Sequence, residues 1–236
     1  MRLKRFALWL TAILAFLMII PVNAASKKTM YVVTSIKRVH NPYTYTYTIK
    51  YNKNGLLEEC SSGYTKGCKY DKNGVLKQEG DKVYTIKKGV RVKGVTPSTT
   101  YKYKWKNGQC VEVKSGNVRY TYAYDSKGNM TKEEVYIDNV LTYTYAYTYN
   151  NKGHRLTYDF WSKSGGLSST AYELKYKNGR LKTVEHKSAS LNATITYTYS
   201  KVKVPKKLVE KVNAQQQYIL NEWRVKKGYI LNEFFG

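Results

Sequence analysis

The stretch Tyr120–Glu133, which reads YTYAYDSKGNMTKE, decides the fold. Every second residue from position 120 to 124 is tyrosine, so the three rings lie on one face of an extended strand. Tyrosine and threonine favour strands because bulky and β-branched side chains fit a pleated surface. Gly128 supplies the positive φ that closes a three-residue loop after Asp125. The loop places Tyr124 opposite Met130 on the same face, and the stretch therefore predicts a β-hairpin.

The same unit recurs along the chain, which indicates a repeat protein. Its turn glycine appears at Gly55, Gly74, Gly108, Gly128, Gly153 and Gly179. Four copies have a three-residue loop. In the other two, an Asn-Gly pair predicts a two-residue turn. Lys87-Lys88-Gly89 is a candidate degenerate copy.

The turn lengths predict which residue lies opposite each aromatic side chain. The predicted core pairs are Tyr51 with Leu57, Tyr70 with Leu76, Trp105 with Cys110, Tyr124 with Met130, and Tyr176 with Leu181. Tyr149 is the exception, because it faces Arg155 unless a one-residue slip brings Leu156 opposite it. Since tyrosine shares its face with Leu and Met, we expect this face to be the core. The alternative is that it forms an exposed binding platform.

Short strands with frequent turn signals predict an all-β fold for residues 26–204. We expect an antiparallel meander of repeated β-hairpins, roughly twelve to fourteen strands, forming an elongated, twisted or curved sheet. Residues 30–39 predict the first strand pair or an N-terminal cap. Residues 188–204 predict the last strands.

The composition changes after Pro205. Apolar and amide side chains recur at helical spacing, at Leu208, Val212, Gln216, Ile219 and Trp223. Residues 205–236 therefore predict an amphipathic helix and a tail, with the helix covering one end or the concave face of the sheet. The alternative is a helix on a membrane surface, because lysines flank the apolar stripe. The segment YILNE occurs twice, starting at Tyr218 and at Tyr229.

The pattern Y-x-Y-[DN]-x-x-G-x-[LM] is complete at Tyr122–Met130, and its second half matches at Tyr70–Leu76. It resembles the YD repeat of the Rhs-type family. The resemblance implies stacked β-hairpins from secreted or surface bacterial proteins. Large family members form shells around toxin domains, a role for which this chain is too short. The aromatic-rich repeats also resemble choline- and glucan-binding wall repeats, although the tandem Trp-Tyr pairs of those repeats are absent.

Residues 1–25 predict a secretory signal peptide. Arg2, Lys4 and Arg5 precede a fifteen-residue apolar run, which ends at Pro21 and is followed by small residues. The alternative, an uncleaved membrane anchor, is disfavoured because the run is short for a membrane span. We therefore expect a secreted, extracellular protein, cell-wall-associated in one reading, with no transmembrane span after cleavage.

The formal net charge is +25, or +22 without the three cations of residues 1–25. A basic protein outside the cell meets polyanions such as teichoic acids, anionic lipids and acidic glycans. The alternative is that the lysines keep an edge-rich sheet soluble and unpaired. The charge therefore favours an anionic partner without identifying it.

Three cysteines are present, and an odd number in a secreted chain leaves at least one of them unpaired. Cys60 and Cys68 flank a seven-residue loop and form a candidate disulfide. Cys110 stands where other copies have Leu or Met, so we expect a small buried hydrophobic residue.

We expect no catalytic, cofactor or metal site. His40, His154 and His186 lack metal-ligand spacing. The chain has no phosphate loop, nucleophile elbow or Cys/His pairing. Paired carboxylates such as Glu58-Glu59 occur, but nothing singles out one pair for glycoside cleavage.

The sequence therefore predicts a secreted, cell-wall- or surface-associated, non-catalytic repeat protein. We expect it to bind or scaffold anionic cell-wall polymers or glycans through lysine and exposed tyrosine, and no specific nucleic acid. The alternative is a protein-partner interaction module of the inhibitor or immunity type, which uses a sheet face or edge. A hydrolase on an unfamiliar β scaffold is a third hypothesis.

Overall fold

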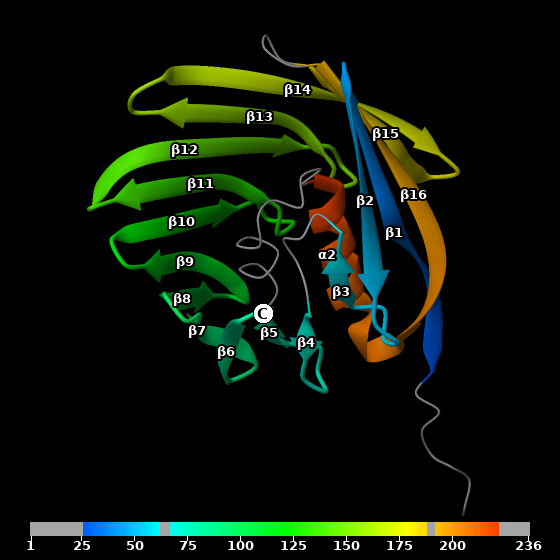
Figure 1. Cartoon of the computed structure of the whole chain (residues 1–236), viewed down its shortest axis with the longest axis horizontal. Coiled ribbons are helices and arrows are strands. Elements are labelled where there is room, and N and C mark those ends of the chain that lie inside the picture. Colours follow the sequence, from blue (N-terminus) through cyan, green and yellow to red (C-terminus); the bar gives the residue numbers. More distant parts are fainter. Residues whose placement is uncertain (1–25, 62–66, 188–191, 222–236) are drawn as a thin grey trace, which may run out of the picture.

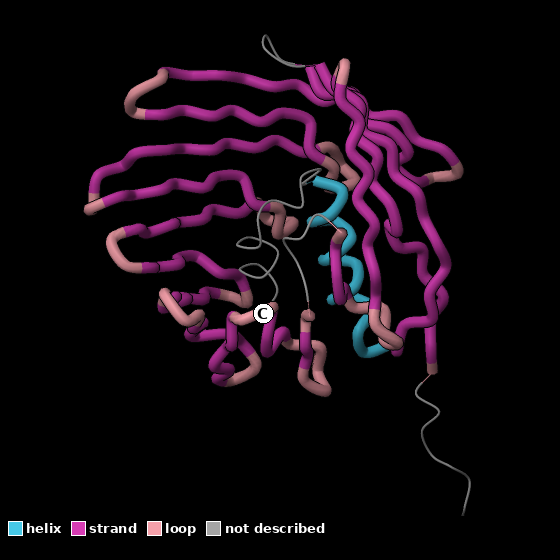
Figure 2. Tube along the Cα trace, in the orientation of Figure 1, coloured by secondary structure: helices cyan, strands magenta, loops and turns pink. Residues whose placement is uncertain are grey.

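The computed structural model describes residues 26–61, 67–187 and 192–221. The predicted signal peptide, Trp223 and the second YILNE segment lie outside these residues. Within them, the chain forms a sixteen-stranded antiparallel sheet and one α-helix, α2 (Figures 1 and 2). The strands are β1 (Lys27–His40), β2 (Tyr43–Tyr51), β3 (Leu57–Cys60), β4 (Lys69–Tyr70), β5 (Leu76–Glu79), β6 (Lys82–Lys87), β7 (Val90–Val95), β8 (Thr100–Lys106), β9 (Gln109–Ser115), β10 (Val118–Tyr124), β11 (Met130–Ile137), β12 (Val140–Tyr149), β13 (Arg155–Ser162), β14 (Gly166–Lys177), β15 (Arg180–Lys187) and β16 (Asn192–Pro205).

Strands β4 to β16 follow one another as a meander, and β16 then pairs with β1, so the order is β3-β2-β1-β16 and onward down to β4. The all-β antiparallel prediction is confirmed, although the sheet has more strands than predicted. Residues 30–39 lie in one long strand, β1, rather than in a strand pair. The described part of 188–204 also forms a single strand, β16, which pairs with β1 over most of its length.

The sheet is nearly closed, so the prediction of an elongated sheet was wrong. Its two edge strands meet, because the Cys68 N–H donates to the Glu58 carbonyl at 3.2 Å. Beside this bond, the Tyr70 hydroxyl donates to the Leu57 carbonyl at 2.6 Å. The right-handed twist between neighbouring strands accumulates around sixteen strands, and register shifts next to the turns bend each hairpin further.

Asp or Asn after the aromatic residue explains the three-residue loops. In each loop, one side-chain oxygen accepts hydrogen bonds from the N–H groups two and four residues later. The four acceptors are Asn52, Asp71, Asp125 and Asn150, with distances of 2.8 to 3.2 Å. The glycine that ends the Asp125 loop has a φ of 84°. Both residues of the turn Asn107-Gly108 also have positive φ.

The register in the structure agrees with the turn lengths. Tyr51 lies opposite Leu57, Tyr70 opposite Leu76, Trp105 opposite Cys110, Tyr124 opposite Met130, and Tyr176 opposite Leu181. Tyr149 lies opposite Arg155 without the slip to Leu156. A register shift accompanies each of these pairs, as a bulge next to the turn requires.

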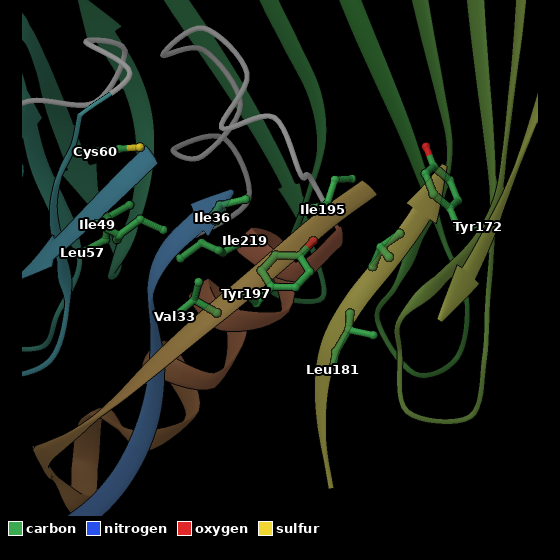
Figure 3. Packing of buried hydrophobic residues seen from close by; sticks show 11 residues of the cluster. Val33, Ile36, Ile49, Leu57, Cys60, Tyr172, Leu181, Ile195, Tyr197 and Ile219 are labelled. Carbon is green, nitrogen blue, oxygen red and sulfur yellow. The ribbon is translucent and has the colours of Figure 1, made fainter. Parts of the chain in front are cut away.

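The tyrosine-bearing face is largely the core. Leu57, Leu76, Cys110 and Leu181 are buried, and most of the aromatic residues opposite them are half-buried. One cluster lies between the β1–β2 side of the sheet and α2, where Val33, Ile36, Tyr197 and Ile219 meet (Figure 3). Further clusters lie along β5–β10 and between β1, β16 and the start of the helix.

Helix α2 (Val209–Asn221), preceded by the 3₁₀ turn η1 (Lys206–Leu208), lies on the concave side of the sheet (Figure 1). Leu208, Val212 and Ile219 are buried. The predicted helix and its packing role are therefore confirmed as far as Asn221, and the described apolar residues of the stripe are covered by the sheet. No helix in the described part of the chain is long and apolar enough to cross a membrane.

Candidate functional site

The aromatic side chains on the concave face of β12 and β13 pack against one another rather than lying open to a ligand. Tyr143 stacks on Phe160, with ring centroids 5.9 Å apart, and Tyr145 stacks on Tyr158 at 6.0 Å. Burial raises the pKa of Tyr145 to about 12, with a further contribution from the negative charge of Glu133. Because neighbouring rings occupy each other's faces, this row offers few faces for stacking a ligand.

On the convex face, most hairpins with lysine also carry glutamate opposite or beside it. Lys50 contacts Glu59 at 3.0 Å, and Lys104 contacts Glu112 at 3.0 Å. Further pairs are Lys114–Glu112, Lys132–Glu134, Lys175–Glu185 and Lys187–Glu173. Hydrogen bonding to Lys132 lowers the pKa of Glu134. Exposed pairs stabilise little, but they neutralise the field of these lysines locally.

The pair of strands β1 and β16 has no such glutamates. Residues 26–57 and 186–209 contain no Asp or Glu, and these two stretches provide β1 and β16. Their register places Lys27, Tyr31, Lys201 and Lys203 on one face, with Tyr31 opposite Lys201. All four side chains are exposed, whereas the opposite face holds Met30, Val32 and Val204, which pack against Leu208 and Val212.

Arg180, at the start of β15, completes this surface. Its guanidinium carbon lies 4.0 Å from the centroid of the Tyr31 ring, and the Lys201 Nζ lies 5.7 Å from the same ring. Tyr31 is 43% exposed. We call Lys27, Tyr31, Arg180, Lys201 and Lys203 the basic ladder. It combines four cations with one exposed ring, and this arrangement suits a ligand with several negative charges.

Two assignments made from the sequence, one for Tyr176 and one for the pair Cys60 and Cys68, differ in the structure. Tyr176, predicted as core, is 37% exposed, because its hydroxyl bonds the His154 Nδ1 and the Asn150 Nδ2, each at 2.8 Å, at the rim of the sheet. Cys60 and Cys68 are free, buried thiols rather than a disulfide, and they belong to different core clusters. Cys110 is a buried free thiol as well.

The residues of the basic ladder were missed in the sequence, although a signal was present. The acid-free stretches 26–57 and 186–209 provide the lysines of β1 and β16, but residues 82–111, which form β6, β7 and β8, also lack Asp and Glu, so this signal alone does not single out β1 and β16. Sequence spacing does not show that they pair with each other, because they lie at opposite ends of the described chain. Within the described residues, no group of three His, Cys, Asp or Glu side chains is arranged to hold a metal ion.

Comparison with known proteins informs the fold alone. No protein-family model matches the sequence, and no curated protein matches it. Among solved structures, the chain is similar to a porin-like protein from Bacteroides vulgatus, with 11% identity, a TM-score of 0.51, and coverage of 71% of this chain and 98% of that one. A TcdB2-TccC3 structure matches with 14% identity and a TM-score of 0.35, over 74% of this chain and 11% of that one.

Proposed function

We propose that the protein is an exported, non-catalytic binding protein for anionic polymers, built from YD-like β-hairpin repeats. The observation that carries the proposal is the basic ladder, whose three exposed lysines lie on β1 and β16, two strands without any acidic residue. Lys201 and Lys203 are two residues apart, about 7 Å along the strand, so one flexible anionic chain reaches both. The predicted signal peptide supports a location where such polymers occur.

Tyr31 adds a contact that lysine alone does not provide. Arg180 already lies over this ring, so the aromatic surface and the positive charge form one continuous patch. A sulfated, phosphorylated or uronic glycan presents both apolar ring faces and negative groups. We therefore favour an anionic glycan or glycan-like wall polymer over an anion without sugar-like surface.

A binding assay with matched charge changes tests the proposal. Binding to immobilised dextran sulfate is measured for the wild type, for Lys201→Gln with Lys203→Gln, and for Lys104→Gln with Lys114→Gln. Both double variants lose two positive charges, but Lys104 and Lys114 contact Glu112. We expect about tenfold weaker binding for the first pair, a much smaller change for the second, and steep weakening of wild-type binding at high salt. Equal losses of affinity in both double variants, or wild-type affinity that does not change with salt concentration, would contradict the proposal. Uncharged dextran serves as the reference matrix.

A protein partner on a sheet face is the second candidate, favoured by one apolar pair that includes an exposed leucine. Leu167 is 70% exposed and lies opposite Trp161 on the β13–β14 hairpin. Edge pairing through β3 or β4 is disfavoured, because these strands already meet. Capture of one dominant protein by the wild type but not by Leu167→Ser, with no dextran sulfate binding, would favour this candidate over the basic ladder.

A further inference from the structure

Strand β2 is longer than the strand that covers its outer side. On one side, β2 pairs with β1 over residues 43–48. On the other side, β3 pairs only with the last three residues of β2, and Figure 1 shows β3 beside the end of β2 alone. Residues 43–47 therefore form a stretch of sheet edge that the meeting of β3 with β4 does not close. We call this stretch the open edge.

The hydrogen bonds of Thr48 show which backbone groups face the open edge. The Thr48 N–H donates to the Ser61 Oγ at 2.7 Å, and the Thr48 carbonyl accepts from the Ser61 N–H at 2.9 Å. Ser61 follows β3, which lies on the side of β2 away from β1. Backbone groups alternate in direction along a strand, so those of Thr46 and Thr44 also point away from β1. In the part of the chain that the structure describes, these two N–H groups and two carbonyls have no hydrogen-bond partner.

The open edge has none of the features that normally keep a strand edge unpaired. Natural edges are protected by lysine, by proline within the strand or by a bulge. Residues 41–49 contain no charged side chain, and the register between β1 and β2 runs without a shift. Tyr43 and Tyr45 are 56% and 43% exposed, whereas Tyr143 and Tyr145 of β12, which has a strand on each side, are half-buried. The edge is therefore ready to accept another strand.

The open edge reads YTYTY, which is identical in both directions. We propose that two copies of the chain pair through this edge as antiparallel strands, with the two-fold axis at Tyr45. In this register, Thr44 lies opposite Thr46 of the partner subunit, and the two residues exchange both backbone hydrogen bonds. The symmetry repeats the exchange, so all the outward groups of both copies are paired. Tyr43 lies opposite Tyr47 of the partner subunit, and the two Tyr45 rings face each other.

The chain already uses the same side-chain pairs between its own strands. Across β12 and β13, Tyr147 lies opposite Tyr158, with ring centroids 5.7 Å apart. The next pair is Thr148 with Thr157, whose hydroxyl oxygens are 2.7 Å apart. Aromatic pairs and threonine pairs stabilise antiparallel strands. A second copy therefore presents to the open edge the side chains that neighbouring strands present within the sheet.

The length of the open edge fits this register. Because Tyr47 lies opposite Tyr43 of the partner subunit, the turn of the partner subunit at residues 41–42 lies beside Thr48. The backbone groups of Thr48 are already occupied by Ser61, so the two strands end where β3 begins to cover β2. The open edge is filled without displacing β3. A strand pair of this length buries little surface, so we expect a weak dimer.

Charge repulsion opposes the dimer, and this separates the inference from the proposed function. Each copy carries +22 once the three cations of residues 1–25 are subtracted from +25. Salt screens this repulsion, so dimerisation should strengthen as the salt concentration rises. Binding to dextran sulfate should weaken under the same change. The dimer does not depend on the anionic ligand, and either result stands without the other.

Sedimentation equilibrium of the full chain, without any polymer, tests the pairing and its register. The wild type is compared with Thr44→Lys, Thr46→Lys and with Thr44→Lys, Thr46→Glu. In the first variant each lysine faces a lysine, and we expect at least a tenfold weaker dimer. In the second variant each lysine faces a glutamate, so the dimer should be at least as tight as that of the wild type. Thr148→Lys, Thr198→Lys adds the same two charges to exposed threonines of β12 and β16, and should weaken the dimer much less.

A cysteine on the two-fold axis provides a second measurement. The Tyr45 Cα atoms of the two copies should lie about 4.5 Å apart, within the range that a disulfide spans. Under mild oxidation, Tyr45→Cys should therefore give at least ten times more covalent dimer than Tyr31→Cys. Tyr31 is a matched control because it is also 43% exposed. The three native thiols are buried, so they do not compete.

Four results would overturn the proposal. The first is a wild type that stays monomeric at every salt concentration, which would leave the open edge to a strand of another protein. The second is a lysine–glutamate variant as weak as the lysine–lysine variant, because the register would then be wrong. The third is an equal loss in the control with lysines on β12 and β16. The fourth is a yield of covalent dimer from Tyr45→Cys no higher than from Tyr31→Cys.

Discussion

The hydroxyl group of Tyr124 donates a 2.7 Å hydrogen bond to the carbonyl oxygen of Cys110, which belongs to the preceding hairpin. The same link recurs along the sheet, from the aromatic side chain before one turn to the residue two after the previous turn glycine. The further links of this kind are Tyr70 to Leu57, Trp105 to Arg91 and Tyr149 to Met130, and Tyr199, which lies within β16 rather than before a turn, bonds the Leu181 carbonyl in the same way. Burial raises the pKa of Tyr70 and Tyr199, so both hydroxyls stay protonated donors. Most neighbouring hairpins are therefore tied together by a side chain that the repeat motif itself specifies, whereas the Tyr176 hydroxyl bonds the side chains of His154 and Asn150 instead.

Tyr124→Phe should lower the free energy of unfolding by about 1–2 kcal/mol, because the Cys110 carbonyl loses its donor in a partly buried place. Urea unfolding measures this change. Tyr136→Phe is the control, since the Tyr136 hydroxyl bonds the Glu134 carboxylate on the convex face. We expect that control to stay within about 0.5 kcal/mol of the wild type. If both variants lowered the free energy of unfolding equally, the hydrogen bond between hairpins would contribute no more than one on the convex face.

Arg91→Leu should leave the stability unchanged or raise it by about 1–4 kcal/mol. Arg91 is fully buried, and its three guanidinium nitrogens have no hydrogen-bond partner in the described part of the chain. The rings of Tyr84 and Trp105 surround it, at 5.1 and 6.0 Å from the guanidinium carbon. Such contacts offset only about 2 kcal/mol of the desolvation cost.

The reciprocal change provides the comparison for Arg91. Leu181 holds the same repeat position and is buried, so Leu181→Arg should cost more than about 3 kcal/mol. Thermal and urea unfolding of both variants measure the difference. A loss of more than about 2 kcal/mol in Arg91→Leu would show that the guanidinium stabilises the core.

Because of His154, the protein should become less stable as the pH falls below about 6.5, the ordinary pKa of histidine. Desolvation and the positive charge of Lys152 lower its pKa in the folded state. The unfolded chain therefore binds a proton near pH 6.5 while the folded protein does not, and the stability conferred by neutral His154 decreases below that pH. His154→Asn, which copies Asn129 in the neighbouring turn, should weaken this dependence in urea unfolding at pH 7.5 and 5.0. His40→Asn is the control, and an unchanged pH dependence in His154→Asn would refute the assignment.

The three thiols should be unreactive until the protein unfolds. Cys60, Cys68 and Cys110 are buried and free, and burial, with the charge of Glu79, raises the pKa of Cys68 to about 12. We expect a thiol reagent at pH 8 to label the folded protein slowly and all three cysteines after denaturation. Mass spectrometry counts the labels. Recovery of a Cys60–Cys68 disulfide from oxidised protein would restore the pairing proposed from their spacing.

The sequence predicted local features well because they depend on chemistry a few residues apart. The Asp125 carboxylate and Gly128 together define a loop, and the loop defines the pairing of Tyr124 with Met130. Hydrogen bonds to Asn129 and Lys127 lower the Asp125 pKa against the opposing effect of partial burial, so the carboxylate stays ionised as an acceptor.

Features that depend on distant segments were not predicted. The closure of the sheet arises from twist summed over every strand, and no local pattern shows that the edge strands β3 and β4 meet. The strand count was low because the β6–β7 hairpin has Ile86 where other copies have an aromatic residue. The basic ladder required the pairing of β1 with β16, which no local pattern specifies. Secretion, the absence of catalysis and the anionic partner stay predictions.

The pairing of β1 with β16 also determines when the fold can be completed. All other neighbours in the sheet are consecutive in the chain, so they pair without waiting for a distant segment. The pairing of β1 with β16 joins residues far apart in the sequence, such as Lys37 and Thr196, so it cannot form until β16 has been synthesised. Until then, β1 exposes an unpaired edge, which is open to strands of other molecules. A slow final step in refolding, and self-association through the unpaired edge of β1 when β16 is removed, are the consequences of that order of assembly.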